Sequence, residues 1–77
     1  MDAQQRETRQ QFDNAFDAYE EHYEDNGETA ELEALHEELV IATRNAGADY
    51  ALPFVWACCC ADCHTRKVVE AICADLN

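Results

Sequence analysis

Residues 12–23 read FDNAFDAYEEHY, and this stretch decides the fold class. Its apolar side chains recur at spacings of three and four residues: Phe12, Ala15, Phe16, Tyr19 and Tyr23. That periodicity places them on one face of an α-helix. The acidic side chains between them recur at similar spacings on another face. The stretch therefore predicts an amphipathic helix over residues 3–25, followed by a stop at the Asn-Gly pair of residues 26–27.

Two further helical patterns follow. Leucine and alanine form a short heptad-like stripe over residues 28–46, and Gly47 is a natural residue after the end of a helix. A third helix is predicted over residues 50–76, with Pro53 tolerated in its first turn. The apolar stripe in its second part is rotated by roughly 100° from the first, whereas a straight helix drifts only about 20° per heptad. We therefore expect this helix to bend or break near residues 64–67.

The expected fold is all-α, a small three-helix bundle. β-Branched residues are few, no alternating run suggests strands, and two short loops imply antiparallel neighbours. Residues 1–77 are expected to form a single acidic domain. Its expected core consists of large apolar residues: Phe12, Phe16, Tyr19, Leu32, Leu35, Leu39, Leu52, Val55, Trp56, Val69 and Ile72. The apolar run at 51–61 is too short to span a bilayer, and we expect it to be the surface of any homodimer.

Charge is distributed unevenly along the chain. The 77 residues carry 17 acidic and 5 basic side chains, for a net charge of −12. Residues 1–38 account for −11 of this, with thirteen acidic side chains against two arginines. Direct nucleic-acid binding needs a basic face that displaces phosphate counterions, so we exclude it. The same sign of charge argues against docking on anionic membranes.

The acidic half is the predicted binding surface. Carboxylates three or four residues apart on a helix lie roughly 5–6 Å from one another, a scale comparable with phosphates along a DNA strand. A row of them can occupy a basic nucleic-acid groove on another protein, helped by electrostatic steering. The predicted contacts include two tyrosines that would anchor the partner if exposed: Asp13, Asp17, Tyr19, Glu20, Tyr23, Glu24 and Glu31.

In size and charge the chain is similar to small acidic proteins of phages and mobile elements. Proteins of that type inhibit restriction, repair and CRISPR complexes. The resemblance implies an inhibitor that mimics nucleic acid, of anti-restriction or anti-CRISPR type, with a basic nucleic-acid-binding complex as its partner. The alternative for the acidic surface is solvation or salt adaptation.

Residues 58–64 read CCCADCH and contain all but one of the five cysteines. Zinc prefers four tetrahedral ligands, and the alternative ligand set is Cys60, Cys63, His64 and Cys73. The pattern also matches c-type haem attachment and a thiol-redox motif, although we place it inside a helix rather than at a helix start. The favoured interpretation is that the cysteines pack as small apolar side chains. No cofactor is therefore expected.

Few other residues indicate chemistry. Glu33 and His36 form an i, i+3 pair of the kind that diiron bundles combine with glutamates of neighbouring helices, here Glu20, Glu21 or Glu24. The chain has no serine and only two glycines, so it contains neither a nucleophile elbow nor a phosphate-binding loop. An enzyme is not expected. The polar N-terminus lacks the apolar region of a signal peptide, so we expect a cytoplasmic location.

Overall fold

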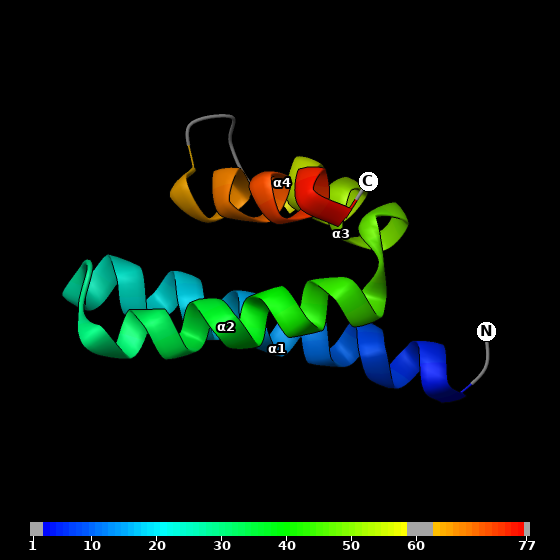
Figure 1. Ribbon diagram of the computed structural model, residues 1–77, viewed down its shortest axis with the longest axis horizontal. Helices are drawn as coiled ribbons and strands as arrows, with labels where there is room; N and C mark the ends of the chain where they lie inside the picture. Colours follow the sequence, from blue (N-terminus) through cyan, green and yellow to red (C-terminus); the bar gives the residue numbers. More distant parts are fainter. Residues whose placement is uncertain (1–2, 59–62, 77) are drawn as a thin grey trace.

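The computed structural model describes residues 3–58 and 63–76, and these form four α-helices. Helix α1 spans Ala3–Asn26, α2 Ala30–Ala46, α3 Ala48–Cys58 and α4 His64–Leu76. Each helix runs back along the one before it (Figure 1). No strand occurs among the described residues, so the prediction of an all-α fold is confirmed.

The prediction of three helices, with the last one bent or broken near residues 64–67, is confirmed only in part. Residues 50–76 contribute to two helices rather than one, and the interruption falls between Cys58 and His64. The residues expected to hold the break instead form the first turn of α4. The out-of-phase apolar stripes explain the reversal, because folding back lets both halves face one core. Val55 of α3 and Val69 of α4 are both fully buried.

The helices form two layers. α1 and α2 pair as an antiparallel hairpin, and the shorter α3–α4 pair is stacked on one face of it (Figure 1). At 1.5 Å per residue, α1 is about 36 Å long, whereas α3 and α4 are about 16 and 20 Å. The upper layer therefore covers only part of the hairpin, and the molecule measures 36 × 23 × 21 Å.

An aromatic cluster joins the two layers. Phe54 of α3 meets Phe12 and Phe16 of α1 edge to face, with ring centroids 5.2 and 5.3 Å apart. Such pairs contribute about 0.5–1.5 kcal/mol beyond the area they bury. Phe54 was not among the predicted core residues, yet its ring contacts both phenylalanines of α1.

Most of the predicted core is confirmed, and Trp56 is the clear exception. Eight of the eleven expected residues are buried, and Leu35 and Leu52 are half-buried. Trp56 is 53% exposed, and its Nε1 donates a hydrogen bond to Glu70 at 3.2 Å. α3 buries Ala51 and Val55, which are one turn apart. Trp56 follows Val55 by roughly 100° around the helix, so it points away from the core.

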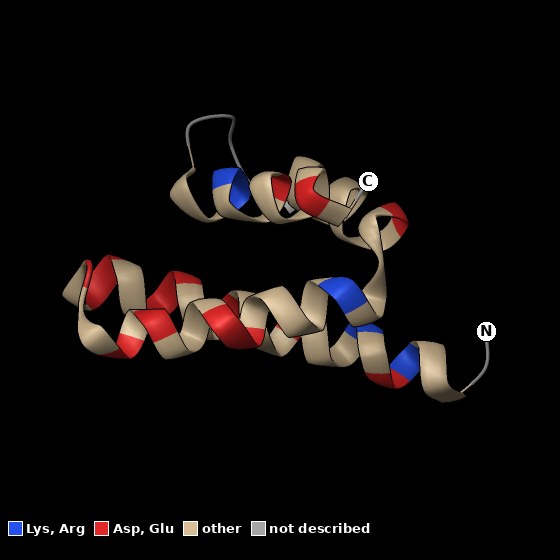
Figure 2. Ribbon diagram, in the orientation of Figure 1, with Lys and Arg blue, Asp and Glu red and all other residues tan. Residues whose placement is uncertain are grey.

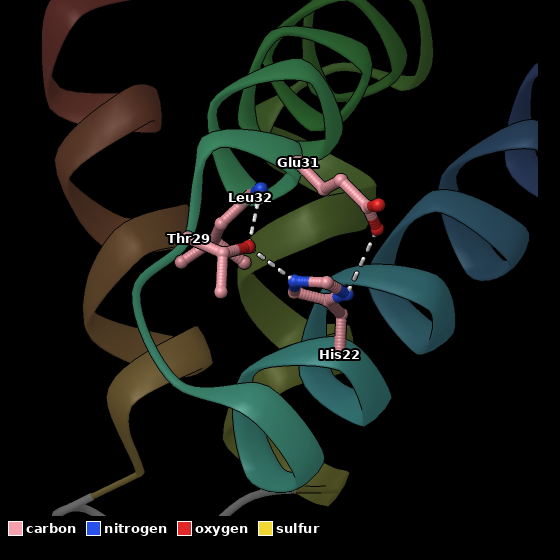
Figure 3. A network of polar contacts seen from close by, with 4 residues as sticks. All are labelled: His22, Thr29, Glu31 and Leu32. Atoms are coloured by element: carbon pink, nitrogen blue, oxygen red, sulfur yellow. Dashed lines mark hydrogen bonds and ion pairs between the residues drawn. The ribbon is translucent and has the colours of Figure 1, made fainter.

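A polar network closes the turn between α1 and α2 (Figure 3). Gly27 has a φ of 69°, a left-handed conformation that glycine adopts without strain. Thr29 caps α2, and its Oγ1 accepts a hydrogen bond from the Leu32 amide at 3.3 Å. The same hydroxyl lies 2.6 Å from His22 Nε2, while His22 Nδ1 lies 3.8 Å from a Glu31 carboxylate oxygen. One hydroxyl therefore links the end of α1 to the start of α2.

Candidate functional site

The acidic side chains of the first half lie on the α1–α2 hairpin, and most of them face solvent. Ten of the twelve within residues 3–38 are exposed, and Figure 2 shows acidic positions along both helices. Residues 12–38 contain eleven acidic side chains and no Lys or Arg. This stretch, the acidic hairpin, is therefore a continuous source of negative potential.

The predicted row on α1 is only partly free. Asp17 and Glu24 are exposed, whereas Asp13 and Glu20 are half-buried. Asp13 accepts a hydrogen bond from the Tyr50 hydroxyl of α3 at 3.0 Å. Glu20 accepts a weak one from the Cys63 thiol at 3.7 Å. Two members of the row therefore bind the upper layer, along the edge where α1 meets it.

The two tyrosines do not meet the condition for partner anchors. Tyr19 is 3% exposed, as expected of a core residue, and its hydroxyl lies 3.1 Å from His64 Nε2. Burial, with smaller contributions from Tyr23 and Glu28, raises the pKa of Tyr19 above its usual value. Tyr23 is half-buried, and its ring stacks on His64 with centroids 3.9 Å apart. The start of α4 covers both rings, an arrangement that helix periodicity alone does not reveal.

The predicted partner contact Glu31 and the residues of the diiron alternative lie in different places. Glu31 is exposed at the start of α2, beside His22. Glu33 and His36 line the side of α2 that faces α4, whereas Glu21 lies by Leu35 in a hollow between α1 and α2. Among the described residues, no group of three or more His, Cys, Asp or Glu side chains is placed to hold a metal ion.

The two cysteines whose side chains are described, Cys63 and Cys73, lie too far apart for the alternative zinc site. Cys63 immediately precedes α4, where its carbonyl accepts a hydrogen bond from the Lys67 amide at 3.2 Å. Cys73 follows ten residues later, a rise of about 15 Å along the helix. Two thiolates on one zinc ion lie only about 4 Å apart, so these two cysteines cannot share one. The alternative set with Cys60 and His64 is therefore not assembled as predicted, and Cys60 itself lies outside the described residues.

Cys73 is a core residue. It is 1% exposed and packs with the apolar cluster. Burial, and to a smaller extent Glu70, raises the pKa of its thiol. These properties match the favoured interpretation of the cysteines for this one position.

The predicted homodimer surface at 51–61 is only partly available. Ala51 and Val55 face the core, whereas Pro53, Trp56 and Ala57 are exposed on α3. Residues 59–61 lie outside the described part of the chain. Any dimer contact made by the described segment would therefore centre on the exposed indole of Trp56.

A feature absent from the predictions runs along α2 and α4, where two hollows adjoin. We call them together the seam groove. The first, of about 670 Å³, is lined by Glu28, Glu33, Glu37 and the rings of Tyr19, His36 and His64, among others. The second, of about 220 Å³, shares His36 and continues past Val40, Arg44, Val68, Ile72, Asp75 and Leu76. Glu33, Glu37, Val40 and Arg44 recur at helical spacing, but finding the groove requires knowing that α4 lies beside α2.

Comparison of the chain with known protein families, with curated proteins and with solved structures found no match. Within the described residues, none of the helices combines the length and apolar character needed to cross a membrane. A function for this chain therefore has to be inferred from the chemistry of its own residues.

Proposed function

We propose that this chain is a small helical interaction protein whose acidic hairpin binds a basic protein. The observation that carries the proposal is the segregation of charge. Eleven acidic side chains and no Lys or Arg occupy residues 12–38, and ten of the twelve acidic side chains within residues 3–38 are exposed. Like charges held this close repel one another, and a basic partner would relieve that repulsion.

The preferred partner is a nucleic-acid-binding complex, which the chain would inhibit by occupying its basic groove. Such grooves present Lys and Arg side chains to phosphates. Asp17 and Glu24 are seven residues apart, about 10 Å along α1, and both are exposed. The inhibitor needs no catalytic group, so the proposed role is non-enzymatic, and its proposed location is cytoplasmic.

Competition with DNA provides a direct test. The chain is immobilised, host proteins are bound at about 0.1 M salt, and duplex DNA is then added in excess. We expect the retained proteins to be released by the DNA, and also by salt well above 0.1 M, because screening weakens exposed charge contacts. Retained proteins that resist both treatments would contradict the proposal.

Matched charge reversals place the contact on the hairpin. The double variant Asp17→Lys, Glu24→Lys changes the net charge by +4, and so does the control Glu7→Lys, Asp49→Lys outside residues 12–38. All four side chains are exposed. We expect the first variant to lose the DNA-releasable partner and the control to retain it, with both still helical by circular dichroism. Equal behaviour of the two variants would show that the hairpin is not the contact surface.

A second candidate function is a thiol-redox role. It is favoured by the place of Cys63 at the start of α4, since oxidoreductases put reactive cysteines at helix N-termini. Oxidation in a glutathione buffer should then form a reversible disulfide between Cys60 and Cys63, detected by mass spectrometry. Both thiols remaining free under those conditions would exclude it. Elemental analysis of the native chain tests the zinc alternative in the same preparation.

A further inference from the structure

The seam groove has two chemically different ends. At the first, the carboxylates of Glu33 and Glu37 stand one turn apart on α2, with Glu28 nearby. The N-termini of α2 and α4 both lie at this end, and each contributes about +0.5 of a charge. Three carboxylates exceed that compensation by about two charges, so this end of the groove attracts cations.

The other end is apolar. Val40 of α2 faces Val68 and Leu76 of α4 across the second hollow. Leu76 is 37% exposed and lines this hollow. Arg44 and Asp75 flank this hollow with opposite charges. Because these two charges offset each other, this end offers a cation no net attraction, unlike the end at Glu33 and Glu37.

We propose that the seam groove binds a short peptide segment of a partner protein, in which arginine side chains adjoin an apolar stretch. The proposal rests on the proposed function, because it names the part of the basic partner that this surface would hold. The arginines lie at Glu33 and Glu37, and the apolar side chains lie against Val68 and Leu76. From Glu33 to Arg44 is about 16 Å along α2, which about five extended residues span.

Arginine suits the first hollow better than lysine does. Its planar guanidinium pairs with a carboxylate through two hydrogen bonds and also stacks on ring faces. The exposed ring of His36 and the half-buried ring of His64 line the same hollow as Glu33 and Glu37. Rings and carboxylates in one place therefore match the two binding modes of a single side chain.

The test uses synthetic peptides as probes. The first has two arginines and three leucines separated by one glycine, and it is prepared in both chain directions. The second replaces the leucines with serines, and the third replaces the arginines with lysines. Binding is followed by titration of backbone amide NMR signals at low salt. We expect the arginine–leucine peptide to bind about tenfold more tightly than the serine peptide, and to shift signals of His36, Val68 and Leu76.

Variants then separate the groove from general charge. Glu33→Gln with Glu37→Gln should weaken the arginine–leucine peptide about tenfold. The control Glu7→Gln with Asp49→Asn makes the same change in net charge at two exposed positions away from the groove and should weaken it less than about threefold. Val68→Thr keeps the side-chain shape but replaces a methyl group with a hydroxyl, and should weaken only the leucine-containing peptides.

The possible failures are distinguishable. Equal affinity for the leucine and serine peptides, or equal losses in the two charge variants, would overturn the groove as a binding site. In that case salt-sensitive binding of both arginine peptides would leave the proposed function intact. No binding of any arginine peptide at low salt would contradict both proposals.

Discussion

Replacing Thr29 with alanine tests how firmly the two helices of the acidic hairpin are joined. The hydroxyl accepts a hydrogen bond from the Leu32 amide and lies 2.6 Å from His22 Nε2 (Figure 3). Loss of an N-cap costs about 1 kcal/mol, and loss of the His22 hydrogen bond about 1 kcal/mol more. The His22 side chain is 14% exposed but Thr29 is exposed, so water can offset part of the second loss and about 2 kcal/mol is the upper end of the expected cost.

The expected change in melting temperature follows from the chain length. An unfolding entropy of about 2.1 cal/mol/K per residue gives about 160 cal/mol/K for the whole chain. A loss of about 2 kcal/mol therefore lowers the melting temperature by about 12 °C. This is a large share of the stability of a domain this size, which is about 4–12 kcal/mol.

Thermal unfolding followed by circular dichroism at neutral pH measures the effect. Thr29→Ser keeps the hydroxyl and should melt within about 3 °C of the original chain. A double-mutant cycle with His22→Ala should give a coupling of about 1 kcal/mol between the two side chains. A decrease below about 4 °C for the alanine variant, or equal decreases for alanine and serine, would refute the reasoning.

Three further predictions concern buried side chains. Phe54→Ala should destabilise the fold by about 3–4 kcal/mol, and Trp56→Ala by about 1 kcal/mol. Equal destabilisation by the two variants in chemical denaturation would contradict the role of the aromatic cluster. Because burial raises the pKa of Cys73, its thiol should resist iodoacetamide near pH 9 until the chain unfolds. The half-buried Cys63 should be labelled before Cys73. Equal labelling rates of the two cysteines, measured by mass spectrometry, would contradict this prediction. The pKa of Tyr19 is also raised, so above about pH 10 the folded chain retains a proton that the unfolded chain loses. The free energy of unfolding should therefore be independent of Tyr19 ionisation below that pH and decrease above it. Tyr19→Phe should reduce the slope of this decrease in alkaline unfolding experiments.

Helix periodicity was sufficient to predict the bounds of α1 and α2. The bounds of α1 and α2 lie within two residues of the predicted 3–25 and 28–46, because their apolar stripes are long and end at Gly27 and Gly47. It was insufficient for α3 and α4. Two apolar stripes out of phase indicate that a helix must be interrupted, but not where, and the interruption fell ahead of the predicted residues.

The misassigned side chains of α3 have the same origin. Trp56 was assigned to the core from its place in the first apolar stripe of a helix predicted to span residues 50–76. Once α3 ends at Cys58, its buried face is set by Ala51 and Val55, and Phe54 rather than Trp56 reaches the rings of α1. A stripe defines a helix face only over the length of the actual helix.

For the candidate site, composition predicted the charge and its concentration in the first half. It did not predict which carboxylates are free. Asp13 and Glu20 have partners from segments 37 and 43 residues away, and such contacts arise only from tertiary packing. The seam groove was also not predictable from the sequence. It forms only because α4 lies beside α2, and neither helix pattern alone indicates it.

Four helices that alternate in direction return the chain to the end where it began. Figure 1 shows the N- and C-termini near the same end of the molecule, and the turn between α1 and α2 at the other. A purification tag, surface tether or fused fluorescent protein at either terminus therefore points away from the end of the hairpin where Glu28, Glu33 and Glu37 gather. Labelled or immobilised forms of the chain should thus present this acidic end to solution, and attachment through either terminus should give equivalent binding results.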